Sequence, residues 1–136
     1  MKVKLDNGAY LPEHGHPMDA GLDFRAPYSF SIYPNERKTV DTGVHVKLPT
    51  DSVGFIAGKS KLMREKGIIS QGIVDASYRD SIHVILINTS RQIVDFEVGD
   101  RIAQLVVVPC LYVDIEEVQN LPVISYEDYD KKEKQE

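Results

Sequence analysis

Short runs of alternating hydrophobic and polar residues dominate the chain, and they predict β-strands rather than helices. Residues 44–48 alternate regularly, residues 81–87 alternate at first and then become continuously apolar, and residues 102–108 are apolar almost throughout. The last pattern is typical of a strand that is buried on both faces. Turn-forming residues separate the runs, at 33–36, 48–51 and 98–100. This spacing predicts an all-β domain of many short antiparallel strands, a sandwich, barrel or jelly roll.

Only one stretch has helical character. Residues 60–66, SKLMREK, are long enough for one or two turns, and Gly67 is placed to end the helix in a left-handed conformation. The chain has 136 residues, which fits one domain and leaves little room for two. We assign residues 1–125 to the β domain and residues 126–136, YEDYDKKEKQE, to a charged, flexible C-terminal tail.

Composition narrows the classes of function. Hydrophobic residues make up 42% of the chain, which is enough for a core. The formal net charge of -5 argues against non-specific nucleic-acid binding, although a few local cations can still hold a small anion. No apolar run has the length of a membrane span, and the N-terminus lacks the apolar core of a signal peptide. We therefore expect a cytoplasmic protein with neither nucleic-acid nor membrane partners, and the single cysteine, Cys110, excludes an internal disulfide.

A possible phosphate site lies in residues 54–62, GFIAGKSKL, which predict a strand, a glycine turn and a short helix. The first backbone N–H groups of such a helix have no partner within it and suit an anion. Lys59, Lys61 and the Ser60 hydroxyl would lie beside them. Ser60 as a plain N-cap would use the same donors, so the two interpretations are compatible.

Asp75 is a lone carboxylate between the apolar pair Ile73 and Val74 and the segment ASYR. Ordinary turn chemistry explains an aspartate at the end of a strand. The alternative is a general base that holds and polarises a water molecule aimed at an electrophile on the neighbouring phosphate site. Tyr78 would then supply a flat wall for a sugar or base, although a tyrosine also serves as ordinary core or rim packing.

Asp23 and Gln104 are polar residues within predicted strands. Residues 19–26, DAGLDFRA, alternate in the manner of a half-exposed strand, so Asp23 is expected on the solvent face. Gln104 interrupts an otherwise apolar strand, and a buried amide must find hydrogen-bond partners, either in the backbone or in a ligand. His45 and His83 are typical strand residues and add no further chemistry.

In order and spacing, four segments resemble the motifs of the trimeric, all-β dUTPase family. Residues 20–26, AGLDFRA, are similar to the first motif, Ala-Gly-x-Asp-Leu-x-Ala, and residues 58–62, GKSKL, stand where the second, Pro-Arg-Ser-Gly-Leu, belongs. Residues 72–82, GIVDASYRDSI, resemble the third motif, Gly-x-Ile-Asp-x-x-Tyr-Arg-Gly-x-Ile. Residues 99–105, GDRIAQL, match the fourth letter for letter. The resemblance covers about residues 11–109, most of the chain.

This resemblance implies a distorted jelly-roll subunit with one short helix, and a homotrimer with three active sites at subunit boundaries. It also implies hydrolysis of dUTP by water to dUMP and pyrophosphate, with Mg²⁺ carried on the triphosphate. Asp75 matches the catalytic aspartate that activates the water attacking the α-phosphorus. Tyr78 matches the tyrosine packed under the deoxyribose, where a 2′-hydroxyl would clash. The backbone near Gly72 and Ile73 would bind the edge of uracil, and its tight fit would exclude the methyl group of thymine.

The same match assigns the phosphate side of the site. Ser60 and Gln104 match residues that contact the phosphates, and the charges of Lys59 and Lys61 would serve the triphosphate. Asp23 matches an acidic residue that places the hydrated metal indirectly, through water. The Mg²⁺ would be octahedral and held mostly by phosphates and water.

Three positions depart from the motifs. Lys59 replaces an arginine, which keeps the charge but loses the planar, bidentate fork. Lys61 replaces a glycine, so the turn there must either avoid positive φ or be strained. Asp80 replaces the glycine that follows Tyr-Arg in the third motif.

The C-terminus departs further. The family's fifth motif is a glycine-rich arm, with an arginine and a phenylalanine, that closes over the nucleotide. Residues 126–136 contain none of these three residue types. Tyr126 or Tyr129 could stack on the base instead, and a nearby lysine could meet the γ-phosphate, namely Lys131, Lys132 or Lys134. An unstructured tail, a shortened chain and a diverged member of altered activity are the other interpretations.

Two alternative functions follow from these departures. The first is a dUTPase-like nucleotide-binding or regulatory protein with weak or no turnover, because the closing arm is missing. The second is a dCTP deaminase, which shares the fold. Deamination would need a glutamate on the strand after the hairpin, where this chain has Leu86, Ile87 and Asn88.

Overall fold

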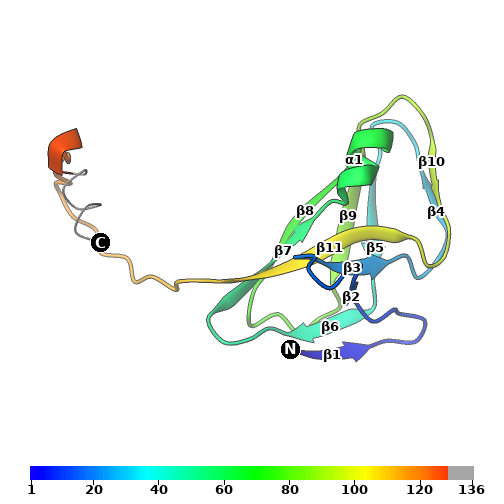
Figure 1. The fold of residues 1–136 in the computed structure, drawn as a ribbon, viewed down its shortest axis with the longest axis horizontal. Helices are drawn as coiled ribbons and strands as arrows, with labels where there is room; N and C mark the ends of the chain where they lie inside the picture. The colour runs from blue at the N-terminus through cyan, green and yellow to red at the C-terminus, as the bar shows by residue number, and fades with distance from the viewer. Residues whose placement is uncertain (129–136) are drawn as a thin grey trace.

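A body of antiparallel strands forms most of the computed structural model, which describes residues 1–128 (Figure 1). The elements are β1 (Lys2–Leu5), β2 (Glu13–His14), β3 (Leu22–Arg25), β4 (Phe30–Ile32), β5 (Arg37–Asp41), β6 (Val44–Lys47), β7 (Ser52–Ala57), α1 (Ser60–Lys66), β8 (Ile68–Val74), β9 (His83–Asn88), β10 (Val94–Phe96) and β11 (Arg101–Pro109). Three of the strands confirm runs found in the sequence: β6 and β9 the two alternating runs, and β11 the continuously apolar one.

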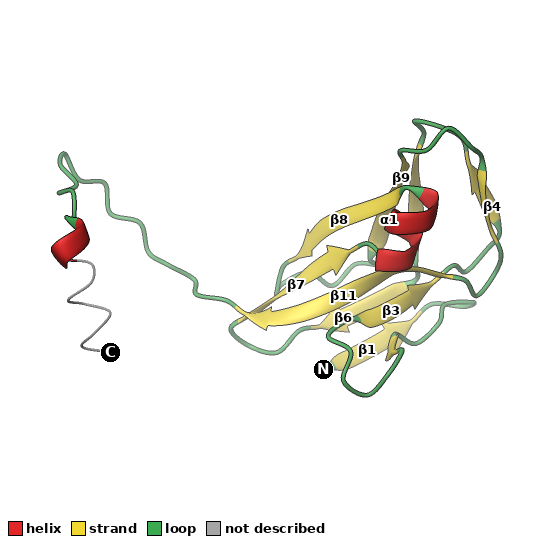
Figure 2. Ribbon diagram, turned by 45° about the horizontal axis from the view of Figure 1, so that its top comes forward, coloured by secondary structure: helices red, strands yellow, loops and turns green. Residues whose placement is uncertain are grey.

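One curled sheet organises the body. Its strand order is β2-β3-β11-β7-β8-β9-β5, and two further two-stranded ribbons, β1-β6 and β4-β10, belong to the same body. All of these neighbours run antiparallel. The inward side chains include Phe24, Ile32, Leu86, Ile102 and Leu105, none of which is measurably exposed. The fold is therefore the predicted all-β, distorted jelly roll (Figure 2).

Helix α1 lies between β7 and β8 and has the predicted bounds. Gly67 ends it with φ 68°, the left-handed conformation that glycine adopts without a steric penalty. One expectation was wrong: Lys59, in extended conformation, is the N-cap, and Ser60 is already the first helical residue. The turn after Gly58 therefore ends one residue earlier than a Ser60 cap would require. Lys61 lies inside the helix without positive φ, so its replacement of a glycine causes no backbone strain.

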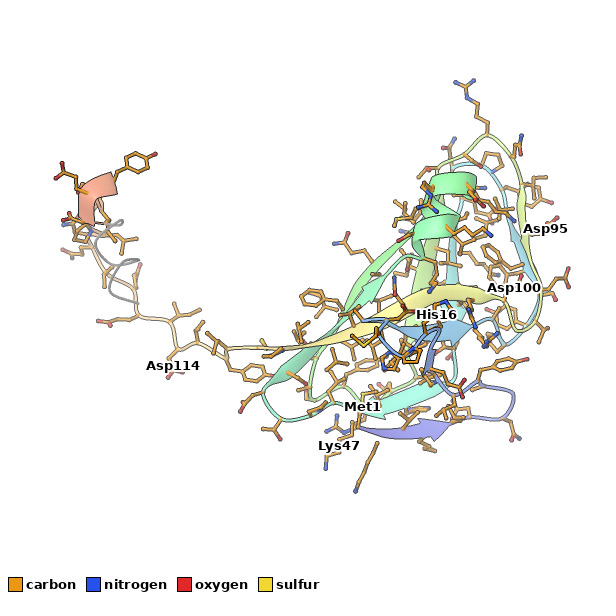
Figure 3. The ribbon with its side chains drawn as sticks, in the orientation of Figure 1. Met1, His16, Lys47, Asp95, Asp100 and Asp114 are labelled. Atoms are coloured by element: carbon orange, nitrogen blue, oxygen red, sulfur yellow. The ribbon has the colours of Figure 1, made fainter. Side chains whose placement is uncertain are left out.

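The segment after β11 leaves the body (Figures 1 and 2). From Cys110 to residue 125 it has no regular structure, so the domain predicted for residues 1–125 contains an extended portion. Asp114 marks this portion in Figure 3. Its large apolar side chains are mostly exposed: Leu111, Tyr112, Val113, Ile115, Val118, Leu121, Val123 and Ile124.

Some expectations concern the end of the chain. The proposed contacts of Tyr129, Lys131, Lys132 and Lys134 lie outside the described residues, as does most of the predicted tail. Among residues 1–128, no helix is both long enough and apolar enough to cross a membrane.

Candidate functional site

Asp23 lies at the centre of a buried charge cluster on β3. The residue is only 4% exposed, and its Oδ1 lies 2.5 Å from Lys59 Nζ. Its Oδ2 lies 3.5 Å from Arg101 Nε. The expected exposed position of Asp23 was therefore wrong. Alternation along one strand does not reveal that side chains from distant segments, Lys59 and Arg101, contact the carboxylate.

Gln104 fixes the turn that leads into α1. It pairs with Asp23 across β3 and with Ala57 across β7. Its Nε2 donates a hydrogen bond to the Gly58 carbonyl at 2.9 Å. A Cβ on Gly21 would lie 2.1 Å from Gln104 Oε1, so only glycine allows this amide its position. The sequence left open whether the Gln104 amide binds backbone or a ligand, and this hydrogen bond is to backbone. An amide nitrogen has two N–H donors, so the second N–H of Gln104 Nε2 can still bind a ligand.

Ser60 and Lys61 follow this turn as the first two residues of α1, and both are exposed. Neither side chain makes a hydrogen bond or ion pair within residues 1–128. Lys59 differs, because its ammonium group is already paired with Asp23. On the phosphate side, Ser60 and Lys61 can thus reach a ligand directly, whereas Lys59 contributes its charge from within the buried cluster.

The donor set around Asp23 suits an outer contact with a metal rather than direct ligation. Two cations already balance the carboxylate, so it is a weak direct ligand for a divalent ion. However, Oδ2 is buried without a hydrogen-bond donor among the described residues. It can accept a hydrogen bond from a metal-bound water. Residues 1–128 contain no group of three or more His, Cys, Asp or Glu side chains arranged to hold a metal.

The second part of the site is an opening between β8 and β9. These strands pair from Ile68↔Asn88 to Ser70↔Leu86, and the described pairing stops there. Residues 71–74 still pair with β7 on their other side. Along an antiparallel strand the backbone groups of alternate residues point to opposite sides, so between Gln71 and Val74 those on the β9 side face the opening without a strand partner. A pocket of about 140 Å³ lies here, lined by Ile56, Ile73, Val74, Tyr78, Ile82 and His83.

Asp75 follows β8 at the rim of this opening. The residue is exposed, and its carboxylate makes no hydrogen bond with any described residue. Its backbone carbonyl accepts a hydrogen bond from the Tyr78 N–H at 3.0 Å, which closes a turn. The side chain of Asp75 is thus not used in forming the turn, so the interpretation of Asp75 as an ordinary turn residue is not supported. The carboxylate remains available to a water molecule or ligand.

Tyr78 packs its ring against the core while its hydroxyl donates to the Ser81 carbonyl at 2.7 Å. Ser81 in turn donates from its own hydroxyl to Asp41 on β5. This hydrogen bond is the main reason that the pKa of Asp41 lies below its usual value. The ring of Tyr78 is consequently held in a fixed orientation beside the pocket.

The 75–82 loop is also fastened at Arg79. The Arg79 guanidinium donates to the Ala76 carbonyl at 2.6 Å, within the loop. The Arg79 carbonyl lies 2.7 Å from His45 Nδ1, on β6. No sequence pattern predicted the contacts of His45 and Ser81, because their partners are 34 and 40 positions away in the chain.

Within one chain, the two parts of the site lie apart. Asp75 follows Val74, whose partner on β7 is Gly54, and Gly54 pairs with Val107 on β11. Gln104 is three residues further along β11. With ~3.3 Å per residue and ~4.8 Å between strands, the Asp75 and Gln104 backbones are roughly 15 Å apart. A single protomer therefore does not bring the candidate base beside Gln104.

Comparisons with known proteins agree with the sequence motifs. A family model described as dUTPase matches residues 7–131. A deoxyuridine 5'-triphosphate nucleotidohydrolase of Tropheryma whipplei (strain Twist) is 41% identical over 122 residues, which are 87% of this chain and 84% of that protein. A protein of the same name from monkeypox virus is 39% identical over 119 residues, covering 88% of this chain and 79% of the viral one.

Solved structures show the same fold. The Staphylococcus bacteriophage 80alpha dUTPase with dUPNHPP aligns with a TM-score of 0.85 at 24% identity, covering 93% of this chain and 92% of that one. A mutant dUTPase from phage phi11 of S. aureus aligns with a TM-score of 0.81 at 24% identity, covering 88% and 96% of the two chains. At this level of identity, the structural likeness concerns the fold alone.

Proposed function

This chain belongs to the dUTPase family, and on that premise we propose that it is a dUTP diphosphatase, which hydrolyses dUTP to dUMP and pyrophosphate. The observation that carries the proposal is the opening between β8 and β9. Pairing between these strands ends after Ser70, so the backbone edge of β8 around Gly72 and Ile73 is available beside a pocket with an aromatic wall, Tyr78. Backbone donors and acceptors in a fixed strand can bind the edge of uracil, and the narrow pocket disfavours an added methyl group.

In this proposal Asp75 is the general base. Its exposed carboxylate takes a proton from a water molecule as the water oxygen bonds to the α-phosphorus. The bond from the α-phosphorus to the bridging oxygen breaks, and pyrophosphate leaves. Tyr78 lies under the deoxyribose, where its ring leaves no room for a 2′-hydroxyl. Its bond to the Ser81 carbonyl supports this role, because a wall that excludes a small group must be held rigidly.

The phosphate side would be formed by Ser60, Lys61 and the second N–H of Gln104. Their positions around the Gly58 turn support this assignment. Lys59 adds positive charge, and its pairing with Asp23 keeps that charge close to the turn. The buried Oδ2 of Asp23 would accept a hydrogen bond from water on Mg²⁺. When bound, Mg²⁺ would neutralise charge on the triphosphate. The phi11 phage relative is described as coordinating a structural Mg(II) ion.

We further propose a homotrimer with the site shared between subunits. The separation of Asp75 from Gln104 supports this, since a complete site would need Asp75 of one chain beside Gln104 of another. Exposed apolar side chains on the outer face of the sheet support it too: Phe55, Ile69, Ile73, Ile85 and Ile87. The apolar segment from Cys110 onward offers additional surface for a neighbouring copy.

One assay tests the activity. Purified protein with Mg²⁺ is offered dUTP, dCTP, dTTP and UTP, and pyrophosphate release is measured. We expect turnover of dUTP alone, and a loss of about 10²–10⁴-fold in Asp75→Asn, because a positioned base contributes that much and its amide analogue cannot take the proton. Equal turnover by Asp75→Asn would disprove the role of Asp75. Binding of dUTP by calorimetry without turnover would favour the regulatory alternative, and ammonia release from dCTP would favour the deaminase.

A second experiment tests the shared site. Sedimentation should give about three times the chain mass of 15.3 kDa. Asp75→Asn and Gln104→Leu proteins, each inactive alone, should recover part of the activity when their subunits are exchanged, because some mixed sites would carry neither substitution. A monomer, or an absence of recovery after confirmed exchange, would exclude sharing.

A further inference from the structure

His45 lies between two acceptor groups from different parts of the chain. On one side its Nδ1 is 2.7 Å from the Arg79 carbonyl oxygen, in the 75–82 loop. On the other side its Nε2 is 3.0 Å and 3.1 Å from the two oxygens of the Asp6 carboxylate, in the turn after β1. We call this arrangement of the His45 ring, the Asp6 carboxylate and the Arg79 carbonyl the His45 clasp.

The chemistry of the clasp requires a doubly protonated ring. A neutral imidazole has one N–H donor and one lone pair, so it can donate to only one of two acceptors. At the other nitrogen a lone pair would face an oxygen. Only the imidazolium can donate on both sides, and one of its hydrogen bonds is then charge-assisted at both ends. The Arg79 carbonyl and next the Asp6 carboxylate raise the pKa of His45 above its usual value of 6.5.

Other charged groups around the ring act in both directions. Lys4 faces His45 directly across the β1-β6 ribbon and opposes its protonation. Lys2 and Lys47 form a pair two positions along the ribbon, on the same face, and the end of the ribbon is marked by Met1 and Lys47 in Figure 3. With the Arg79 side chain they line a groove of about 440 Å³ around the ring. Asp41, on β5, is near enough to sense the charge of His45.

The clasp acts on the loop that carries the candidate site residues. Arg79 directly follows Tyr78, and the loop runs from Asp75 to Ile82, where the Ile82 N–H donates to the Val44 carbonyl beside His45. We propose that His45 is a positioning residue, which as an imidazolium holds the 75–82 loop in place and releases the Arg79 carbonyl when it loses its second proton. The consequence for dUTP rests on the proposed function.

Two NMR titrations of the protein without substrate test the clasp. The first follows the His45 ring, assigned by its absence in His45→Gln. The second follows the amide nitrogen of Asp80, which belongs to the same peptide unit as the Arg79 carbonyl. We expect the ring to titrate above pH ~6.5 and the Asp80 signal to move with the same midpoint. A His45 midpoint at or below that value, or an Asp80 signal that does not follow it, would overturn the proposal.

Two variants that keep the histidine sharpen the result, and each removes one charge beside it. Asp6→Asn should lower both midpoints, whereas Lys4→Gln should raise both. Opposite shifts distinguish the clasp from a general effect of net charge. Lys66→Gln, on the surface of α1, is the control and should leave both midpoints unchanged. Shifts in the same direction for Asp6→Asn and Lys4→Gln would contradict the assignment.

A kinetic comparison then tests positioning. As pH rises through the His45 midpoint, KM for dUTP should increase about three- to tenfold, with less change in kcat, because the clasp does not contact Asp75. His45→Gln keeps a donor and should restore part of the affinity that His45→Leu loses, while neither variant should show the KM transition. A KM for dUTP that does not change as the pH passes through the His45 midpoint would overturn the positioning role of His45. Absence of dUTP turnover, with both NMR titrations as expected, would support the clasp and overturn the proposed function instead.

Discussion

Three side chains on the phosphate side of the site are held by ion pairs or hydrogen bonds, namely Asp23, Lys59 and Gln104, whereas the 75–82 loop is held through its backbone. Asp23, Lys59 and Gln104 contact one another or adjacent backbone across β3, β7 and β11. In the loop, hydrogen bonds hold the backbone carbonyls of Arg79 and Ser81, and the Asp75 carboxylate is left exposed. The difference fits the proposed roles, since phosphate binding needs a fixed array and a general base needs an uncommitted side chain.

The largest expected effect lies on the packed side. In Gly21→Ala the new Cβ would meet Gln104 Oε1 at 2.1 Å and Gln104 Cβ at 2.9 Å. Displacing this amide should lower the free energy of unfolding by about 2–3 kcal/mol in a urea titration. Gly72→Ala is the control, because its nearest contact is the flexible end of Ile56 at 3.3 Å. A loss below about 1 kcal/mol is expected there. Equal losses in the two variants would contradict this account of the packing.

The next effect concerns the buried charge cluster. Lys59→Met leaves Asp23 with Arg101 as its only described counter-charge, and Lys59 is partly exposed. We expect a loss of about 1–2 kcal/mol in the free energy of unfolding, less than for a fully buried pair. Lys61→Met, two positions along, removes an equal charge outside the cluster and should change stability by less than about 0.5 kcal/mol. If both substitutions cost the same, the ion pair with Asp23 contributes nothing specific.

A smaller effect on stability is expected at Tyr78, whose hydroxyl makes one of the hydrogen bonds that hold the 75–82 loop. Tyr78→Phe removes the bond to the Ser81 carbonyl and should cost about 1 kcal/mol of stability, while the ring stays in place. Selectivity for dUTP over UTP should therefore persist in Tyr78→Phe and fall in Tyr78→Ala. Tyr33→Phe, at an exposed turn, is the control for stability. Unchanged selectivity in Tyr78→Ala would remove the proposed wall.

The smallest effect is a pH dependence at Asp41. Its pKa is lowered in the folded protein, first by the Ser81 hydroxyl and then by the Gly43 N–H. The stabilisation is therefore present above the usual value of 3.8 and is lost as the pH falls through the lowered pKa. Solvent screens this exposed carboxylate, so the change is small. The slope of the free energy of unfolding against pH, below pH 3.8, should therefore become flatter in Asp41→Asn. An unchanged slope would show that Asp41 is not the source of this pH dependence.

Local pattern was sufficient for much of the fold. Alternation located β6 and β9, a continuous apolar run located β11, and a single glycine, Gly67, correctly ended α1. These features depend on neighbours within a few positions, where steric and hydrogen-bonding preferences act directly. The four motifs likewise identified the family, because their spacing is a property of the chain itself.

Tertiary structure decided what those residues do together. Alternation placed Asp23 in solvent, but the residue is buried, and two cations from distant segments contact its carboxylate and balance its charge. The end of pairing after Ser70 and the clasp on Arg79 also depend on register between strands far apart in sequence. The sequence alone determined which elements form and which residue types are present. Their burial and charge partners are set only when the sheet closes, because both depend on what packs against each strand from outside it.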